Sequence, residues 1–214
     1  ANAAIEDSFS ADSLVNIYSS GKSLESILLA IMADKGLVDF ERSVSSYWPE
    51  FVGGGKDKLT VADVMRHEAG LSRLDVTLTA AQLRSAALRR NSVGALLETH
   101  ELRYADENSP REYHAITRGW IANEIFRRVE PENKTMGEYL RAQVSEPLGI
   151  DVYFDLSPDD SGRVRRVKSR GVFAQMLDCF APGSQARRIG LTPLELMKRI
   201  WAIYPAVRSG LGFK

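Results

Sequence analysis

IYSSGKSLESILLAI, residues 17–31 of the chain, contains a Ser-x-x-Lys pattern at the head of a strongly periodic apolar segment. Apolar side chains recur at positions i, i+3, i+4 and i+7, which predicts an amphipathic helix over residues 20–33. The predicted inward residues are Leu24, Ile27, Leu28 and Ile31. Gly36 follows where a helix commonly ends.

Ser19 and Lys22 are three residues apart at the start of this predicted helix. Residues i and i+3 share a helix face, so the lysine amine can lie next to the serine hydroxyl. A serine is a weak nucleophile until a neighbouring base takes its proton, and a helix N-terminus favours the developing negative charge. The pattern alone equally suits a capping serine and a solvated lysine, because a chain of this length contains about one such match by chance.

The composition is that of an ordinary globular protein. The chain has 214 residues, 44% of them hydrophobic and 26% charged, and Lys+Arg and Asp+Glu both total 28. Zero formal net charge gives no reason to expect nucleic acid or anionic membrane as a partner. We find neither an apolar run of the ~20 residues that a membrane span needs nor a signal peptide. Cys179, the single cysteine, is expected to be a buried thiol in a reducing compartment.

Four capping-box patterns mark further helix starts. They are Thr60/Asp63, Thr79/Gln82, Thr135/Glu138 and Thr192/Glu195, and they predict helices near 61–67, 80–90, 136–145 and 193–204. A further helix should cover residues 114–128, with an inward face of Trp120, Ile121, Ile125 and Phe126. Residues 152–154 and 172–174 are short strand candidates, so the pattern indicates a mostly helical chain.

Several blocks of the chain resemble the serine β-lactamase and penicillin-binding-protein superfamily, including its esterase relatives. The blocks are IYSSGKS (17–23), ADKGLVD (33–39), VSSYWPEF (44–51), LTVADVMRHEAGL (59–71) and EPLGI (146–150). The resemblance reaches about residue 156 and implies an α/β (α+β) fold, with helices packed on an antiparallel sheet beside a helical lobe. We expect residues 1–214 to form a single β-lactamase-related domain that is incomplete, carries mainly the helical lobe and lacks the flanking strands.

The same resemblance implies the roles of three side chains. Ser19 takes the nucleophile position, Lys22 the position of its base, and Tyr113, in EYHAITRGW (112–120), that of the phenol that relays the proton. Ala115 replaces the Asn or Ser of the family's second motif, which favours an esterase or peptidase over a true β-lactamase. The third motif, Lys-Thr-Gly or His-x-Gly on a strand, is not found, because the glycine-rich residues 210–214 lack strand context.

A metal site is not expected. His67-Glu68 begins like the zinc motif His-Glu-x-x-His, but its second histidine would fall on Leu71. The resemblance instead gives His67 a structural role at the turn after its helix. We predict no metal and no cofactor.

Two features lie outside these motifs. The basic cluster Arg163, Arg165, Arg166, Lys168 and Arg170 is expected in a solvated loop or paired with acids, with docking of an acidic partner as the alternative. The apolar face of the helix near 193–204 is expected to pack in the core, with a partner interface as the alternative. Its members are Leu194, Met197, Trp201 and Tyr204.

Two functional hypotheses follow. The first is a serine hydrolase that acts on a small-molecule ester or amide through an acyl-enzyme on Ser19. The second is a catalytically inactive scaffold, or a subunit of a larger assembly, which Ala115 and the missing third motif favour. Both leave room for a protein partner or oligomer. The single cysteine and the family's relatives favour an intracellular or organellar, mitochondrial, location.

Overall fold

The computed structural model describes residues 9–104, 110–165, 176–177, 179–182, 184, 188 and 190–201. The chain divides into two compact units, Tyr18–Asp155 with Ala206–Lys214 and Ala1–Ile17 with Leu156–Pro205. Within the described ranges, pairing of extended segments is limited to two isolated bridges, Leu14 with Val164 and Ser43 with Thr60. The prediction of a mostly helical chain is therefore confirmed for the part described, and the prediction of one domain stays a prediction.

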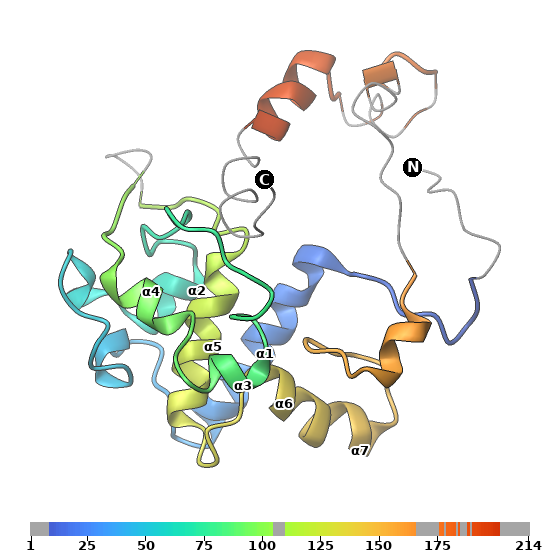
Figure 1. Ribbon diagram of the computed structural model, residues 1–214. Helices are drawn as coiled ribbons and strands as arrows, with labels where there is room; N and C mark the ends of the chain where they lie inside the picture. Colours follow the sequence, from blue (N-terminus) through green and yellow to red (C-terminus); the bar gives the residue numbers. More distant parts are fainter. Residues whose placement is uncertain are drawn as a thin grey trace. The chain divides into compact units, whose positions relative to one another are not determined.

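The larger unit is built from short helices around one longer pair (Figure 1). The pair is α1 (Lys22–Asp34), which follows the 3-10 turn η1 (Tyr18–Gly21), and α5 (Thr117–Val129). The other helices and turns are η2 (Val44–Ser46), η3 (Lys56–Lys58), α2 (Val61–Met65), α3 (Ser85–Leu88), α4 (Gly94–Thr99), α6 (Met136–Leu140), the π-helical turn η4 (Arg141–Ser145) and α7 (Glu146–Leu148).

Helix α1 confirms the predicted helix but turns a different side to the core. It ends before Gly36, whose φ of 71° lies in the left-handed region that glycine adopts without strain. Leu28, Leu29 and Met32 are fully buried, whereas Ile27, predicted inward, is 54% exposed. Helix α1 has more apolar residues than one face can bury. Its packing against α5 buries those around Leu28.

Two capping boxes start helices as predicted. The Thr60 hydroxyl accepts from the Asp63 N–H at the head of α2, and the Asp63 carboxylate accepts from the Thr60 N–H. Thr135 and Glu138 exchange the same pair of bonds at the head of α6, which continues through η4 and α7 to residue 148. Both boxes are local, so a sequence pattern is sufficient to predict them.

The third capping box does not start the predicted helix over residues 80–90. Thr79 and Gln82 do exchange hydrogen bonds, but residues 80–84 form turns and the helix is limited to α3. Side-chain bonds of this kind also close isolated turns. Only Leu88 is fully buried in this segment, so little tertiary packing is present to extend a helix.

The strand predicted at residues 152–154 is absent, and the segment is irregular. The Val152 carbonyl accepts a hydrogen bond from the Ser145 hydroxyl, so this backbone acceptor serves the end of η4. No neighbouring extended segment among the described residues pairs with residues 152–154, and a strand needs such a partner. The other strand candidate, residues 172–174, lies outside the described residues.

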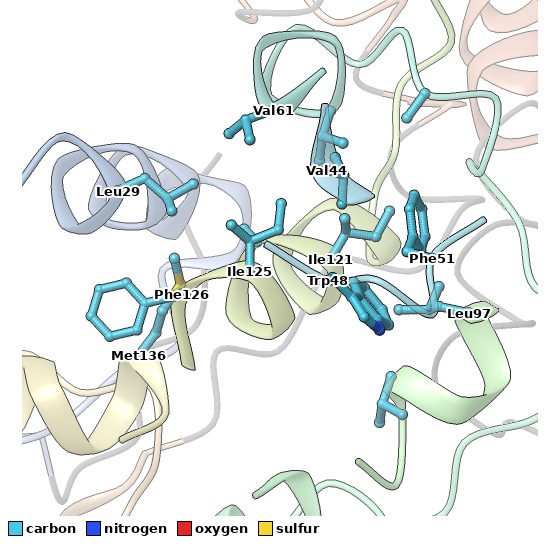
Figure 2. Packing of buried hydrophobic residues seen from close by; sticks show 14 of the residues in the cluster. Leu29, Val44, Trp48, Phe51, Val61, Leu97, Ile121, Ile125, Phe126 and Met136 are labelled. Carbon is cyan, nitrogen blue, oxygen red and sulfur yellow. The ribbon is translucent and has the colours of Figure 1, made fainter. Parts of the chain in front are cut away.

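The core of the larger unit surrounds α5. Figure 2 shows Ile121, Ile125 and Phe126 of this helix packed between Leu29 of α1 and Trp48, and all five are fully buried. The inward face of the helix predicted at 114–128 is thus confirmed, although its Trp120 is only half-buried. Because α5 is enclosed, the residues at its first turn are held firmly, and this turn adjoins the site described below.

In the smaller unit, the turn η5 (Asp159–Arg163) and a helical segment at residues 193–201 are described. Cys179 is buried, as expected. Core packing was expected for the apolar face of the helix near 193–204. This expectation is wrong for the described part, where Leu194, Met197 and Trp201 are 66%, 45% and 73% exposed. The helix buries Leu196 instead, because Leu196 lies on another side of the helix from this stripe. Tyr204 lies outside the described residues.

The basic cluster is described only in part. Arg163 lies 3.9 Å from the carboxylate of Asp160 and donates to the Asp12 carbonyl at 3.0 Å. Arg165 donates to the Gly162 carbonyl at 2.7 Å. The Arg163–Asp160 contact agrees with the expected pairing with acids, whereas the other two bonds go to backbone carbonyls. Arg166, Lys168 and Arg170 lie outside the described residues.

Candidate active site

Ser19 lies in the tight turn η1, directly before α1. Tyr18 has a φ of 47°, a left-handed conformation that bulky residues adopt at a cost of roughly 1–2 kcal/mol. Gly21 is buried, and a side chain there would meet the Phe154 ring. The turn leaves Ser19 exposed. Lys22 is the first residue of α1, so serine and lysine both lie at the start of the predicted helix.

Tyr113 supplies the contact that sequence spacing could not show. Its hydroxyl donates a 2.6 Å hydrogen bond to Ser19 Oγ across 94 positions of sequence. This distance is at the short end of the range for O–H···O hydrogen bonds. Tyr113 is 45% exposed and Ser19 is also exposed, so neither residue is enclosed in the core.

Lys22 extends toward the segment that carries Tyr113. Its Nζ donates a 2.7 Å hydrogen bond to the carbonyl of Ala115 and lies 5.4 Å from the centroid of the Tyr113 ring. The three residues predicted as a site are therefore brought together. Ala115 lacks the side chain of the family motif, but its backbone carbonyl still holds the lysine.

His67 fastens the chain on both sides of Tyr113. Its carbonyl accepts from the Glu112 N–H at 3.0 Å, and its Nδ1 accepts from the His114 N–H, also at 3.0 Å. The His67 ring also lies 4.9 Å from the Tyr113 ring, centroid to centroid. The structural role expected for His67 can therefore be specified: its hydrogen bonds fix the backbone that presents Tyr113.

His114 is completely buried and also acts as a fixed acceptor. Its Nε2 accepts from the Leu71 N–H at 3.0 Å, so its Nδ1 must donate to the Glu112 carbonyl at 2.6 Å. Burial lowers the pKa of His114, which the bond to Glu112 opposes. Burial, followed by the positive charge of Arg118, lowers the pKa of His67 from 6.5 to about 4. Both rings are therefore neutral at pH 7.

Sequence reasoning missed Arg118 and Glu25. Both are buried, with side chains 7% and 13% exposed, and Arg118 Nε lies 3.0 Å from Glu25 Oε2. The sequence offered one signal for Arg118, which is a charged residue at the start of a helix with a predicted inward face. It offered no signal that Glu25, 93 positions away, is its partner.

Among the described residues, no three His, Cys, Asp or Glu side chains gather closely enough to hold a metal ion. Both nitrogens of the His114 ring, and Nδ1 of the neighbouring His67 ring, already hold backbone hydrogen bonds. No helix within the described ranges has the length and apolarity needed to cross a membrane.

Comparison with known proteins gives a consistent picture. The family model described as Beta-lactamase matches residues 1–187. The chain is 36% identical over 143 residues to "Esterase/beta-lactamase LipL" of Mycobacterium tuberculosis, which covers 67% of this chain and 31% of LipL.

Two solved structures are similar over most of the chain. A penicillin-binding protein homolog from Caulobacter crescentus matches with a TM-score of 0.65 and 32% identity, over 75% of this chain and 42% of that one. A family VIII carboxylesterase matches with a TM-score of 0.62 and 32% identity, over 72% of this chain and 41% of that one. The chain thus spans about a third of LipL and about two fifths of these two structures.

Proposed function

This chain belongs to the beta-lactamase family, and we propose that it carries the nucleophilic half of a serine hydrolase that is acylated on Ser19. The family match over residues 1–187 and the similar structures give it a β-lactamase/transpeptidase-like fold, whose helical part is the one described. Because the chain spans less than half the length of these relatives, the activity and substrate of the whole protein belong to this proposal.

One observation carries the proposal, namely the 2.6 Å hydrogen bond between the Tyr113 hydroxyl and Ser19 Oγ, beside Lys22. A serine acts as a nucleophile when a neighbouring group can accept its proton. In the proposed reaction, Ser19 Oγ bonds to the carbonyl carbon of the substrate while its proton passes to Lys22 Nζ, because the Tyr113 hydroxyl donates to Ser19 Oγ and keeps its own proton for the leaving group. The Lys22–Tyr113 pair then protonates the leaving group as the bond from the carbonyl carbon to that group breaks.

The remaining steps use the turn η1 and water. The backbone N–H of Ser19 stabilises the negative charge on the substrate oxygen, as one of the two donors that such reactions need. Water then attacks the acyl carbon, the Ser19 ester bond breaks, and the proton taken from that water returns to Ser19 Oγ through the same pair.

Esters are the proposed substrates ahead of β-lactams. Ala115 offers its carbonyl to Lys22 and has no side-chain amide with which to bind the amide group of a β-lactam. The name of one relative, a family VIII carboxylesterase, supports the same preference, while LipL is named as both an esterase and a beta-lactamase.

The test is covalent labelling with a fluorophosphonate, followed by mass spectrometry to locate the adduct. We expect an adduct on Ser19 that Ser19→Ala abolishes. Ser20→Ala is the matched control, because Ser20 is also exposed and lies next to Ser19. Its labelling should equal that of the wild type.

Lys22→Ala tests the assigned base. We expect the labelling rate to fall by about 10²- to 10⁴-fold, the usual contribution of general base catalysis. A folded protein without an adduct on Ser19 would refute the hydrolase and support the scaffold alternative. An adduct on Ser19 at equal rates with and without Lys22 would refute the role of the lysine.

A further inference from the structure

Arg118 forms the junction between the elements that carry the proposed site. It lies in the first turn of α5 and is 6% exposed. Its Nη2 donates to the Lys22 carbonyl at 2.6 Å, its Nη1 to the Met65 carbonyl at 3.3 Å, and its Nε to Glu25 at 3.0 Å. One guanidinium thus joins the first turn of α1, the end of α2 and the start of α5.

Lys22 is held at both of its ends by one short segment. The Ala115 carbonyl accepts from its Nζ at 2.7 Å, while the Arg118 guanidinium donates to its backbone carbonyl at 2.6 Å. With both ends fixed, the direction of the four-carbon side chain is also restricted. This matters because a lysine side chain is otherwise free to adopt many rotamers.

We propose that Glu25 and Arg118 form a positioning pair that orients Lys22 relative to Ser19 and Tyr113. The inference rests on the proposed function, because it assigns the pair a role in the acylation of Ser19. Neither side chain is proposed to touch the substrate. Both act through the lysine that they hold in place.

The same guanidinium supports Tyr113 by a second route. Met65, whose carbonyl it binds, lies two residues before His67, which fixes the backbone on both sides of Tyr113. Burial is the largest cause that lowers the pKa of His67, and the charge of Arg118 is the second largest. It therefore favours the neutral ring that accepts the His114 N–H.

Gly119 makes room for the pair. A Cβ atom at this position would lie 2.8 Å from Glu25 Oε1, too close for a normal contact. A shift of the carboxylate away from this Cβ would disturb its ion pair with Arg118, which lies 3.0 Å from its other oxygen. Glycine is a poor residue for a helix interior, so its place beside Arg118 follows from the approach of Glu25.

Arginine is the residue that this junction requires. Its planar guanidinium presents five N–H donors in a fixed fork, enough for Glu25 and the two carbonyls together. A lysine would keep the charge but would concentrate its donors at one point. Arg118→Lys should therefore loosen the junction without removing its charge.

The first experiment compares Arg118→Lys with Arg127→Lys. Arg127 is a matched control, since it lies on the same helix, its side chain is also 7% exposed, and it pairs with the buried Glu124 at 2.5 Å. It is about 13 Å further along the helix axis. We expect fluorophosphonate labelling of Ser19 to slow by about 10- to 100-fold in Arg118→Lys and less than about threefold in Arg127→Lys.

Gly119→Ala separates positioning from stability. The methyl group should displace the Glu25 carboxylate, while alanine favours the helix more than glycine does. We expect labelling of Ser19 to fall by about 10-fold or more while the protein stays folded, because the helix propensity of alanine offsets part of the cost of displacing the Glu25 carboxylate. The variant also keeps the test informative if Arg118→Lys does not fold.

A second readout does not depend on Ser19. Limited acetylation, quantified by mass spectrometry, should modify Lys22 about threefold faster or more in Arg118→Lys and Gly119→Ala than in Arg127→Lys. If wild-type Ser19 is not labelled, the proposed function fails, and this second readout still decides the inference. Equal Lys22 modification in all three variants, or wild-type Ser19 labelling in Gly119→Ala, would overturn it.

Discussion

His67→Ala should disconnect the segment that presents Tyr113. The substitution removes the Nδ1 that accepts from the His114 N–H at 3.0 Å, and it removes the ring that lies 4.9 Å from the Tyr113 ring. The carbonyl of residue 67, which accepts from the Glu112 N–H, is kept. The change therefore removes one of the two backbone ties and leaves the other.

The expected magnitude follows from these contacts. A partly buried backbone N–H left without an acceptor costs about 1–3 kcal/mol. The lost aromatic contact adds about 0.5 kcal/mol. We therefore expect the free energy of unfolding to fall by about 2–3 kcal/mol. A shift of Tyr113 by about 1 Å should also slow the labelling of Ser19 by up to 10²-fold.

His67→Asn is the matched comparison. Asparagine tolerates the left-handed φ of 66° found at this residue, and its Oδ1 can accept the same N–H. Urea unfolding and fluorophosphonate labelling, measured on all three proteins, should place this variant between the wild type and His67→Ala. Wild-type labelling of Ser19 in a folded His67→Ala protein would refute the reasoning, as would a loss below about 0.5 kcal/mol.

Three further outcomes are expected. Tyr113→Phe keeps the ring beside His67 but removes the hydroxyl on Ser19, so the labelling rate should fall by about 10²- to 10⁴-fold while urea unfolding changes by less than about 1 kcal/mol. Thr135→Ala removes the capping box of α6 and should cost about 1 kcal/mol in urea unfolding with no change in labelling. Because the pKa of His67 is lowered in the folded state, the unfolded chain binds a proton at His67 at a higher pH than the folded chain does. The neutral ring therefore contributes its full stability above pH 6.5, and this contribution is lost as the pH falls toward 4. Wild type should therefore lose stability over this range at up to about 1.4 kcal/mol per pH unit, reduced because the ring is partly exposed, and His67→Ala should lose less.

Local interactions explain the fold predictions that succeeded. The capping boxes at Thr60 and Thr135 each lie within four residues, so the pattern contains both partners. The predictions that failed depend on distant neighbours. Ile27 is exposed and residues 152–154 form no strand, because burial and pairing are decided by whichever segments pack nearby.

The candidate site divides in the same way. Ser19 lies in η1 and Lys22 begins α1, and their spacing of three residues is enough to predict that they are neighbours. Tyr113 could be assigned only through resemblance to a family, because 94 positions separate it from Ser19. The contact of Ala115 could not be predicted from its residue type, because Lys22 binds its backbone carbonyl, which every residue has.

The sequence by itself determined the serine–lysine turn, the capped helix starts and the inward face of α5, because each depends on residues within one or two helical turns of each other. Only the tertiary structure decided that Tyr113 reaches Ser19, that His67 holds the Tyr113 segment, and that Arg118 meets both Glu25 and the Lys22 carbonyl. The physical reason is that hydrogen bonds and ion pairs act over about 3 Å, and chain segments far apart in sequence come that close only after the core around α5 has packed.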